Sequence, residues 1–200
     1  MNNLRMELLE VYRRSVAEFT GRVSQVRDDQ WKAPTPCDDW DVRTLVNHVV
    51  YEDRWASPLF QGATIAEVGD RYEGDVLGAD PAGNAREAGD DSVRELAAPG
   101  ALDRTVHLSY GDTPIAEYVN QLIAEHVVHG WDLAVAIGAD TRMDADVVRA
   151  CAQWFAGQEQ MYREAGMIAP RVESGSAPGE LERLVAAFGR DPDWGQPAKS

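Results

Sequence analysis

The helical spacing of apolar residues is the feature that most restricts the fold of this chain. From the N-terminus onward, apolar side chains recur at mostly helical intervals with polar side chains between them, at Leu4, Leu8, Val11, Phe19, Val23 and Val26. This pattern predicts an amphipathic helix over roughly residues 3–28. Because such a helix has one apolar face, that face must pack against other elements.

Similar patterns between turn-forming residues predict further helices. Asp41 is a typical N-cap for a helix over about residues 42–57, which Pro58 should end. Pro114 suits the first turn of a long helix over about residues 113–138. The remaining predicted helices cover about residues 80–98, about residues 144–165 and part of "LERLVAAFGRDPDWG", where Gly189 should end the last of them.

Little of the sequence favours strands. Only "RTVHLSY" reads as a short extended piece, and "RVESGSAPGE" has the composition of a loop. The expected fold class is therefore all-α, a helical bundle with a short extra helix and loop insertions. Since 44% of the 200 residues are hydrophobic, the chain can bury a core, and we expect a single domain over residues 1–200.

Charge and composition exclude several classes of protein. A net charge of −15 would repel nucleic acid and anionic membranes, so neither is an expected partner. The start of the chain has no signal-peptide pattern, and no apolar run approaches the roughly 20 residues that span a bilayer. Cys37 and Cys151 are too few for a disulfide framework, which fits a reducing cytoplasm.

A group of titratable residues interrupts the apolar pattern of the long third helix. The stretch "AEHVVHGWDLA" carries Glu125, His126, His129 and Asp132. At about 100° per residue, His129 and Asp132 lie about +40° and −20° from Glu125, beside the apolar stripe, whereas His126 at about +100° lies inside it. Side chains three or four positions apart can bind one ion, so either Glu125 with His129 or His126 with His129 is a candidate pair.

His48, in "RTLVNHVVYE", is a third candidate ligand because it faces the apolar side of its helix. If a bundle packs the two helices together, His48 comes opposite Glu125 and His129. The result would be a His/Glu/His site with an open position, as in catalytic zinc centres. The alternative is a hydrogen-bonded core histidine, although a carboxylate at the edge of the core still needs an ion or a positive partner.

Three segments resemble a known family. "TPCDDWDVRTLVNHVV", "HGWDLAVAIG" and "LVAAFGRDPDW" resemble, in this order, segments of actinobacterial metal-binding proteins of the DinB/YfiT-like superfamily, close to the N-terminal domain of mycothiol-dependent maleylpyruvate isomerase. The resemblance extends over nearly the whole chain. It implies a four-helix bundle with up-down-down-up connectivity and a divalent metal, most simply Zn²⁺, held by His48, Glu125 and His129.

The resemblance also bears on the neighbouring residues. It implies that His126 is a core or supporting histidine, and Asp132 could orient a ligand. Glu52 follows His48 by one turn, so it either completes the metal coordination, which would close the site, or is a partly exposed acid. The implied place of Cys37, in the "TPC" turn, is away from the metal and favours a packing role.

Five other residues have a predicted role. Three tryptophans should anchor loops and helix contacts: Trp40, Trp131 and Trp194. His107 has no ligand-like neighbour in the sequence and should be a surface residue. Arg190 is the positively charged residue that comes nearest to a catalytic candidate, yet an arginine beside the C-terminus of a helix more often caps that helix.

The chemistry implied by the resemblance is that of low-molecular-weight thiols. A divalent ion with an open position can bind a thiol such as mycothiol and present its thiolate to an electrophile. The resulting hypothesis is a metal-dependent, thiol-using transferase or isomerase in the cytoplasm, with a homodimer left open. The alternatives are a metal-dependent hydrolase and a non-enzymatic helical module with a structural metal; catalytic residues and the substrate stay unknown. After the fourth long helix we expect no counterpart of the isomerase's separate C-terminal domain, which weakens any assignment of maleylpyruvate itself.

Overall fold

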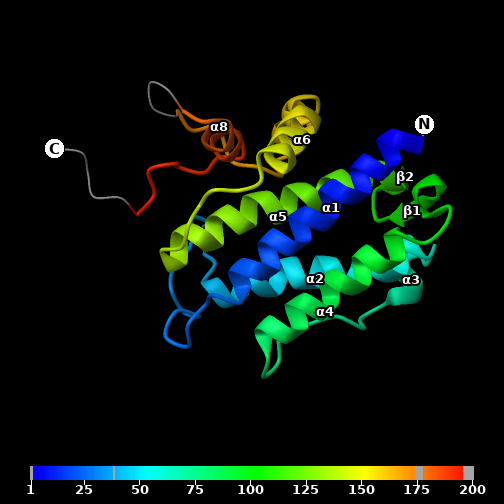
Figure 1. Cartoon of the computed structure of the whole chain (residues 1–200), viewed down its shortest axis with the longest axis horizontal. Helices are drawn as coiled ribbons and strands as arrows, with labels where there is room; N and C mark the ends of the chain where they lie inside the picture. The colour runs from blue at the N-terminus through cyan, green and yellow to red at the C-terminus, as the bar shows by residue number, and fades with distance from the viewer. Residues whose placement is uncertain (1, 38, 174–177, 196–200) are drawn as a thin grey trace.

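A computed structural model describes residues 2–37, 39–173 and 178–195 of the chain. Within these ranges the structure is mostly helical, with one small sheet (Figure 1). Its helices are α1 (Asn2–Val23), α2 (Val42–Phe60), α3 (Ile65–Val68), α4 (Pro81–Leu96), α5 (Ile115–Ile137), α6 (Ala145–Ala156), α7 (Glu159–Glu164) and α8 (Glu180–Ala187), and a 3₁₀ turn covers Ala101–Asp103.

Four long helices form the main body. Helix α5 packs against α1 and α2, and α4 packs against the same two helices from the other side (Figure 1). Helix α6 lies on α5 and α1, and α8 lies on α6. The site residues of α2 and α5 therefore face each other across a helix contact.

The expectation of an all-α fold needs one correction. Strand β1 (Thr105–Leu108) pairs antiparallel with β2 (Gly111–Pro114), so that Val106 lies opposite Thr113. The extended piece was expected, but its partner includes Thr113 and Pro114, which the sequence assigned to the start of the third helix. Pro114 ends the strand and directly precedes α5, which fits its fixed φ and its missing N–H.

The predicted helix ends were partly wrong. Helix α1 ends at Val23, five residues early, where the backbone tightens into a turn with Gln25 N–H donating to Arg22. Helix α2 continues through Pro58, because a proline in the last turn removes only a late hydrogen bond. The helix predicted over 144–165 is two helices. Between them, the N–H groups of Gly157 and Gln158 donate to carbonyls three residues earlier, as in a 3₁₀ turn.

Other expectations at helix ends are confirmed. The Asp41 carboxylate accepts the Thr44 N–H at 2.8 Å as the N-cap of α2. Gly189, just after α8, has a φ of 83°, a conformation that glycine adopts at little cost. The helix α3 was not predicted, and four residues of the expected loop "RVESGSAPGE", 174–177, lie outside the described residues.

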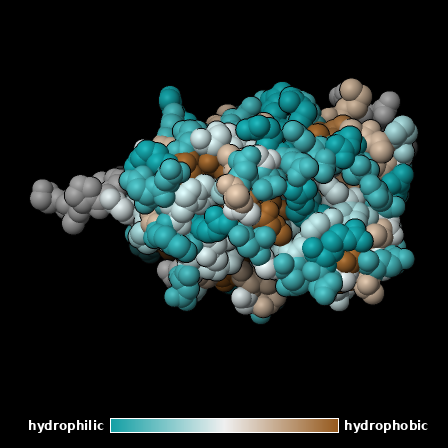
Figure 2. All heavy atoms as spheres, turned by 90° about the horizontal axis from the view of Figure 1, so that it is seen from below, coloured by the Kyte–Doolittle hydropathy of each residue, from teal (hydrophilic) through white to brown (hydrophobic). Residues whose placement is uncertain are grey.

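The core is centred on α5. Every residue from His126 to Ala134 is buried, and no residue of α5 is fully exposed. Other elements cover α5 on several sides, so its buried surface is wider than the single apolar stripe expected from the sequence. By contrast, the face seen in Figure 2 is mostly hydrophilic, with apolar atoms in small separate areas. In the described part of the chain, no helix has both the length and the apolar character needed to cross a membrane.

Candidate metal centre

Three predicted ligands meet between α2 and α5. The Nε2 atom of His48 lies 3.0 Å from Oε2 of Glu125, and Nε2 of His129 lies 3.1 Å from the same oxygen. One potential ligand atom from each residue lies within 4.8 Å of the other two. Helix α5 supplies Glu125 and His129 one turn apart, and α2 supplies His48 from the facing helix.

Charge holds this group together. Burial by itself would raise the pKa of the Glu125 carboxyl, but the positive charge of His129 and hydrogen bonds from both histidines hold that pKa well below its usual range. For His129, burial opposes the charged form, while Glu125 and Asp132 raise the pKa of the imidazole to about 9. Without a bound metal, these shifts favour a carboxylate at Glu125 beside a protonated imidazole at His129.

A chain of polar contacts supports His129 from behind. Its Nδ1 lies 3.0 Å from Oδ2 of Asp132, which is fully buried. The Arg190 guanidinium, which follows α8, donates to the same carboxylate at 3.1–3.3 Å. Arg190 also donates to the carbonyl of Phe188 at 3.3 Å, so the expected cap is only part of its role. Asp132 therefore orients His129 so that Nε2 faces Glu125.

The turn before α2 places an indole ring over the two histidines. The Trp40 ring lies 4.8 Å from the His48 ring and 5.7 Å from the His129 ring, between centroids. Thr35 anchors this turn, because its N–H and hydroxyl both donate to the Trp40 carbonyl. Asp39 has a φ of 67°, a conformation that aspartate tolerates better than most residues. Trp40 thus limits the movement of both imidazoles.

The donor set fits a divalent transition metal. Two imidazole nitrogens and one carboxylate oxygen are ligands that zinc accepts, and a catalytic zinc site has three protein ligands. In a tetrahedral site with bonds of about 2.0–2.1 Å, neighbouring ligand atoms are about 3.3 Å apart, close to the 3.0 and 3.1 Å contacts. A carboxylate that supports a ligand histidine is also typical of such sites.

A cavity of about 550 Å³ opens beside the group, and Glu125 and Glu52 both line it. Glu52 is not among the three residues whose ligand atoms converge. Burial raises the pKa of the Glu52 carboxyl to about 7, and the negative charge of Glu125 adds to the effect. Glu52 therefore lies next to the group, as a carboxyl of the cavity wall.

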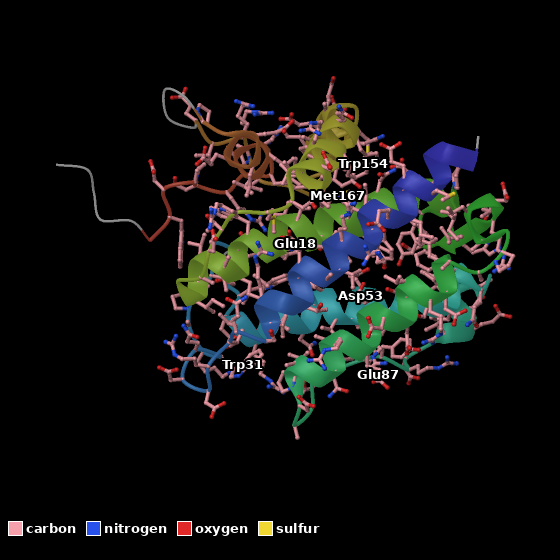
Figure 3. All side chains as sticks on the ribbon, viewed as in Figure 1. Glu18, Trp31, Asp53, Glu87, Trp154 and Met167 are labelled. Atoms are coloured by element: carbon pink, nitrogen blue, oxygen red, sulfur yellow. The ribbon has the colours of Figure 1, made fainter. Side chains whose placement is uncertain are left out.

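His126 points away from the three convergent residues into a separate network. Its Nδ1 lies 3.1 Å from the Ser15 hydroxyl, and its Nε2 lies 3.1 Å from Oδ1 of Asp53. All three side chains are buried, and Tyr12 approaches the same Asp53 oxygen at 3.5 Å. Figure 3 shows Asp53 between α1, α2 and α4, whereas Glu87 lies on the outer side of α4.

Sequence reasoning missed Asp53 as the partner of His126. The signal was available, because Asp53 falls at about +140° from His48, beside the apolar Val49 at about +100°. A carboxylate in that position needs a buried donor, and a histidine on the apolar face of a neighbouring helix is the natural candidate.

Other predicted residues lie outside the group. Cys37 is partly buried, packs against apolar residues and forms no disulfide with the buried Cys151. His107 lies in β1 and is 42% exposed, but its Nδ1 contacts Asp112 at 2.7 Å, so it does have an acidic neighbour. Trp131 is buried in α5, as expected of an anchor.

Known proteins resemble the chain in sequence and in fold. A family model described as the mycothiol maleylpyruvate isomerase N-terminal domain matches residues 12–134. Two Mycobacterium tuberculosis proteins, uncharacterized protein MT0763 (strain CDC 1551 / Oshkosh) and uncharacterized protein Rv0738 (strain ATCC 25618 / H37Rv), are each 31% identical over 197 residues, covering 92% of this chain and 98% of their own.

Two crystal structures share the fold. They are mycothiol-dependent maleylpyruvate isomerase, with a TM-score of 0.54, and its histidine-to-alanine mutant, with a TM-score of 0.56. Each is 17% identical, and the match covers 81% of this chain and 72% of the other. At this identity the likeness concerns the fold alone.

Proposed function

The chain belongs to the family of the mycothiol maleylpyruvate isomerase N-terminal domain, and from this membership we propose that it is a metal-dependent protein that uses a low-molecular-weight thiol. His48, Glu125 and His129 would hold the divalent ion, most simply Zn²⁺. The observation that carries the proposal is the convergence of these three ligand atoms within 4.8 Å, beside a cavity that Glu125 also lines.

The bound ion would supply acidity, lowering the pKa of a thiol so that it reacts as a thiolate. Mycothiol is the candidate thiol, since it appears in the name of the family and of both solved relatives. The thiolate sulfur would then attack an electrophile, either adding to an activated double bond during an isomerisation or displacing a leaving group during S-transfer. The proposed activity is therefore that of a transferase or isomerase acting on small molecules.

The protein's own residues would position the reactants. Asp132 fixes the orientation of His129, and Arg190 balances the buried charge of Asp132. Trp40 covers the two imidazoles, while the cavity holds the electrophile next to Glu125. We further propose that the long helices form the up-down-down-up bundle of the DinB-like superfamily and that residues 1–200 act as one domain.

A hydrolase is the second candidate, and the same cavity favours it over a structural metal. A structural zinc is closed by four protein ligands, whereas the described residues supply three convergent ones and Glu52, although next to them, is not among these three. Thiol dependence separates the candidates: a thiol-using enzyme needs added thiol for turnover, and a hydrolase turns over without it.

Elemental analysis of untagged protein tests the metal assignment. We expect about one divalent ion per chain in the wild type and none in His129→Ala. His126→Ala should keep its ion, because His126 contacts Ser15 and Asp53 instead. His107→Ala is a matched surface control and should also keep it, provided that circular dichroism shows all variants folded.

The reverse pattern, with metal lost from His126→Ala and kept by His129→Ala, would refute the ligand set. Wild-type protein that neither contains metal nor takes up added zinc would refute the enzyme proposal itself.

A further inference from the structure

The cavity beside the three convergent residues has a strongly aromatic lining. Seven aromatic side chains line it: Tyr51, Trp55, Tyr110, Tyr118, Trp154, Tyr162 and Phe188. Trp154 belongs to α6, and Figure 3 shows Met167, another lining residue, near the same helix. A volume of about 550 Å³ lies within the usual range of small-molecule sites, roughly 300–1,000 Å³. Flat apolar molecules are the natural occupants of such a space.

All the charged residues in the lining are acids. Glu52, Glu73 and Glu125 contribute to it, and no lysine or arginine does among the residues that the structure describes. A bound divalent ion would offset the charge of Glu125 but would leave Glu73 and, above its pKa of about 7, Glu52 charged. An anionic group on a ligand, beyond one that touches the ion, would therefore lose its hydration and face carboxylates.

Two arginines near the cavity already have partners, whereas the exposed Arg71, between the lining residues Gly69 and Glu73, lies over the Tyr72 ring. Arg190 is paired with Asp132, and its side chain is 15% exposed. Arg163, next to Tyr162, donates to Glu159 at 2.6 Å and to a backbone carbonyl at 3.0 Å. Recruiting Arg190 or Arg163 for an anionic ligand would break an existing contact, so neither of these two offers a ready anion site.

The polar groups of the lining suit uncharged acceptors. Burial raises the pKa of the Tyr118 hydroxyl well above its usual value, and nearby carboxylates add to the effect, so it stays a neutral donor. The indole N–H of Trp55 is buried out of reach of a ligand, and its interaction with the Tyr51 hydroxyl partly offsets the rise that burial causes in the pKa of Tyr51. A carbonyl or nitro oxygen would accept from a tyrosine hydroxyl of the lining without adding charge.

We propose that this cavity takes an uncharged electrophile with an aromatic or similarly flat apolar body, and that it discriminates against carboxylates. The role of this molecule as the electrophile rests on the proposed function. The binding preference rests only on the lining, so a dicarboxylate is the wrong substrate class for this chain.

Three probes with one aromatic body and different charge test the preference: 2-naphthalenemethanol, 2-naphthylmethylammonium and 2-naphthoate. Their dissociation constants are measured by calorimetry on the full chain at pH 8, without metal or thiol, so that the carboxylate cannot bind an ion. We expect the alcohol and the ammonium to bind at least about tenfold more tightly than the naphthoate. Equal or tighter binding of naphthoate, or no binding of any probe, would overturn the proposal.

Reversing the charge of one lining residue, Glu73, tests whether the cavity causes the binding preference. Glu73 is exposed, so Glu73→Lys should fold normally. It should tighten naphthoate binding and weaken ammonium binding by about two- to fivefold each. Asp28→Lys makes the same change in net charge at an exposed turn outside the lining and should leave the ranking unchanged. An equal effect of both variants would refute a cavity-specific preference.

The two proposals fail separately. If metal analysis refuted the His/Glu/His site, the ranking of the probes would still report on the lining. If the ranking failed while metal and thiol dependence held, the family chemistry would stand and only the substrate class would fall.

Discussion

Replacing Asp53 with alanine removes one partner of a buried carboxylate–imidazole pair. Both side chains are 1% exposed, and Asp53 Oδ1 lies 3.1 Å from Nε2 of His126. Without the carboxylate, that ring nitrogen keeps no partner and cannot reach water, while Tyr12 retains the Ser92 hydroxyl at 2.9 Å. The loss therefore falls mainly on His126.

Leaving a buried polar group unsatisfied in this way costs about 1–3 kcal/mol of the free energy of unfolding. For a chain of this size, that corresponds to a fall in Tm of roughly 2–12 °C. Urea unfolding followed by circular dichroism measures the free energy, and calorimetry measures Tm.

The exposed pair of His107 and Asp112 is a matched control. Its side chains are 42% and 73% exposed, so Asp112→Ala should cost no more than about 1 kcal/mol. A double-mutant cycle with His126→Ala isolates the pair: the double variant should lose clearly less than the sum of the single losses. Additive losses, or a cost of Asp53→Ala as small as that of the control, would show that the network does not stabilise the core as argued.

Two further predictions concern pH and packing. Burial raises the pKa of Glu52 to about 7, so the folded protein binds more protons at this residue than the unfolded chain, and the free energy of unfolding should fall as the pH rises from about 4.5 to 7. In metal-free protein, Glu52→Gln should reduce this fall. A difference in stability between the variant and the wild type that stays the same from pH 5 to pH 8 would contradict the prediction. In α4, a Cβ atom at Gly89 would lie 2.5 Å from a methyl group of Val16 in α1. Gly89→Ala should therefore lower the free energy of unfolding, measured in urea, by about 1–3 kcal/mol. An unchanged or higher stability would mean that α1 and α4 can move apart.

The sequence determined the helical character of the chain and the identity of the candidate ligands. The spacing of apolar residues located the long helices, because a helix must bury one face, and Asp41 fixed the start of α2 through its local capping contact. The titratable residues Glu125 and His129 stood out for the same reason: polar side chains beside an apolar stripe need partners. These are local properties, set by residues a few positions apart.

Helix ends were less predictable, because they depend on competition between neighbouring contacts. Pro58 did not end α2, since the last turn can lose a hydrogen bond at little cost. Helix α6 ends where the Gly157 N–H donates to the carbonyl three residues earlier instead of four. The apolar pattern on either side does not indicate this change.

Only the tertiary structure decided which partner each polar side chain meets. His126 and His129 are three positions apart on one helix, yet the first faces Asp53 and Ser15 while the second faces Glu125 and Asp132. Partners from other helices and from the segment after α8 are far away in sequence, so no local pattern encodes their distances. The acidic, aromatic cavity arises in the same way, because its walls come from segments that meet only when the helices pack.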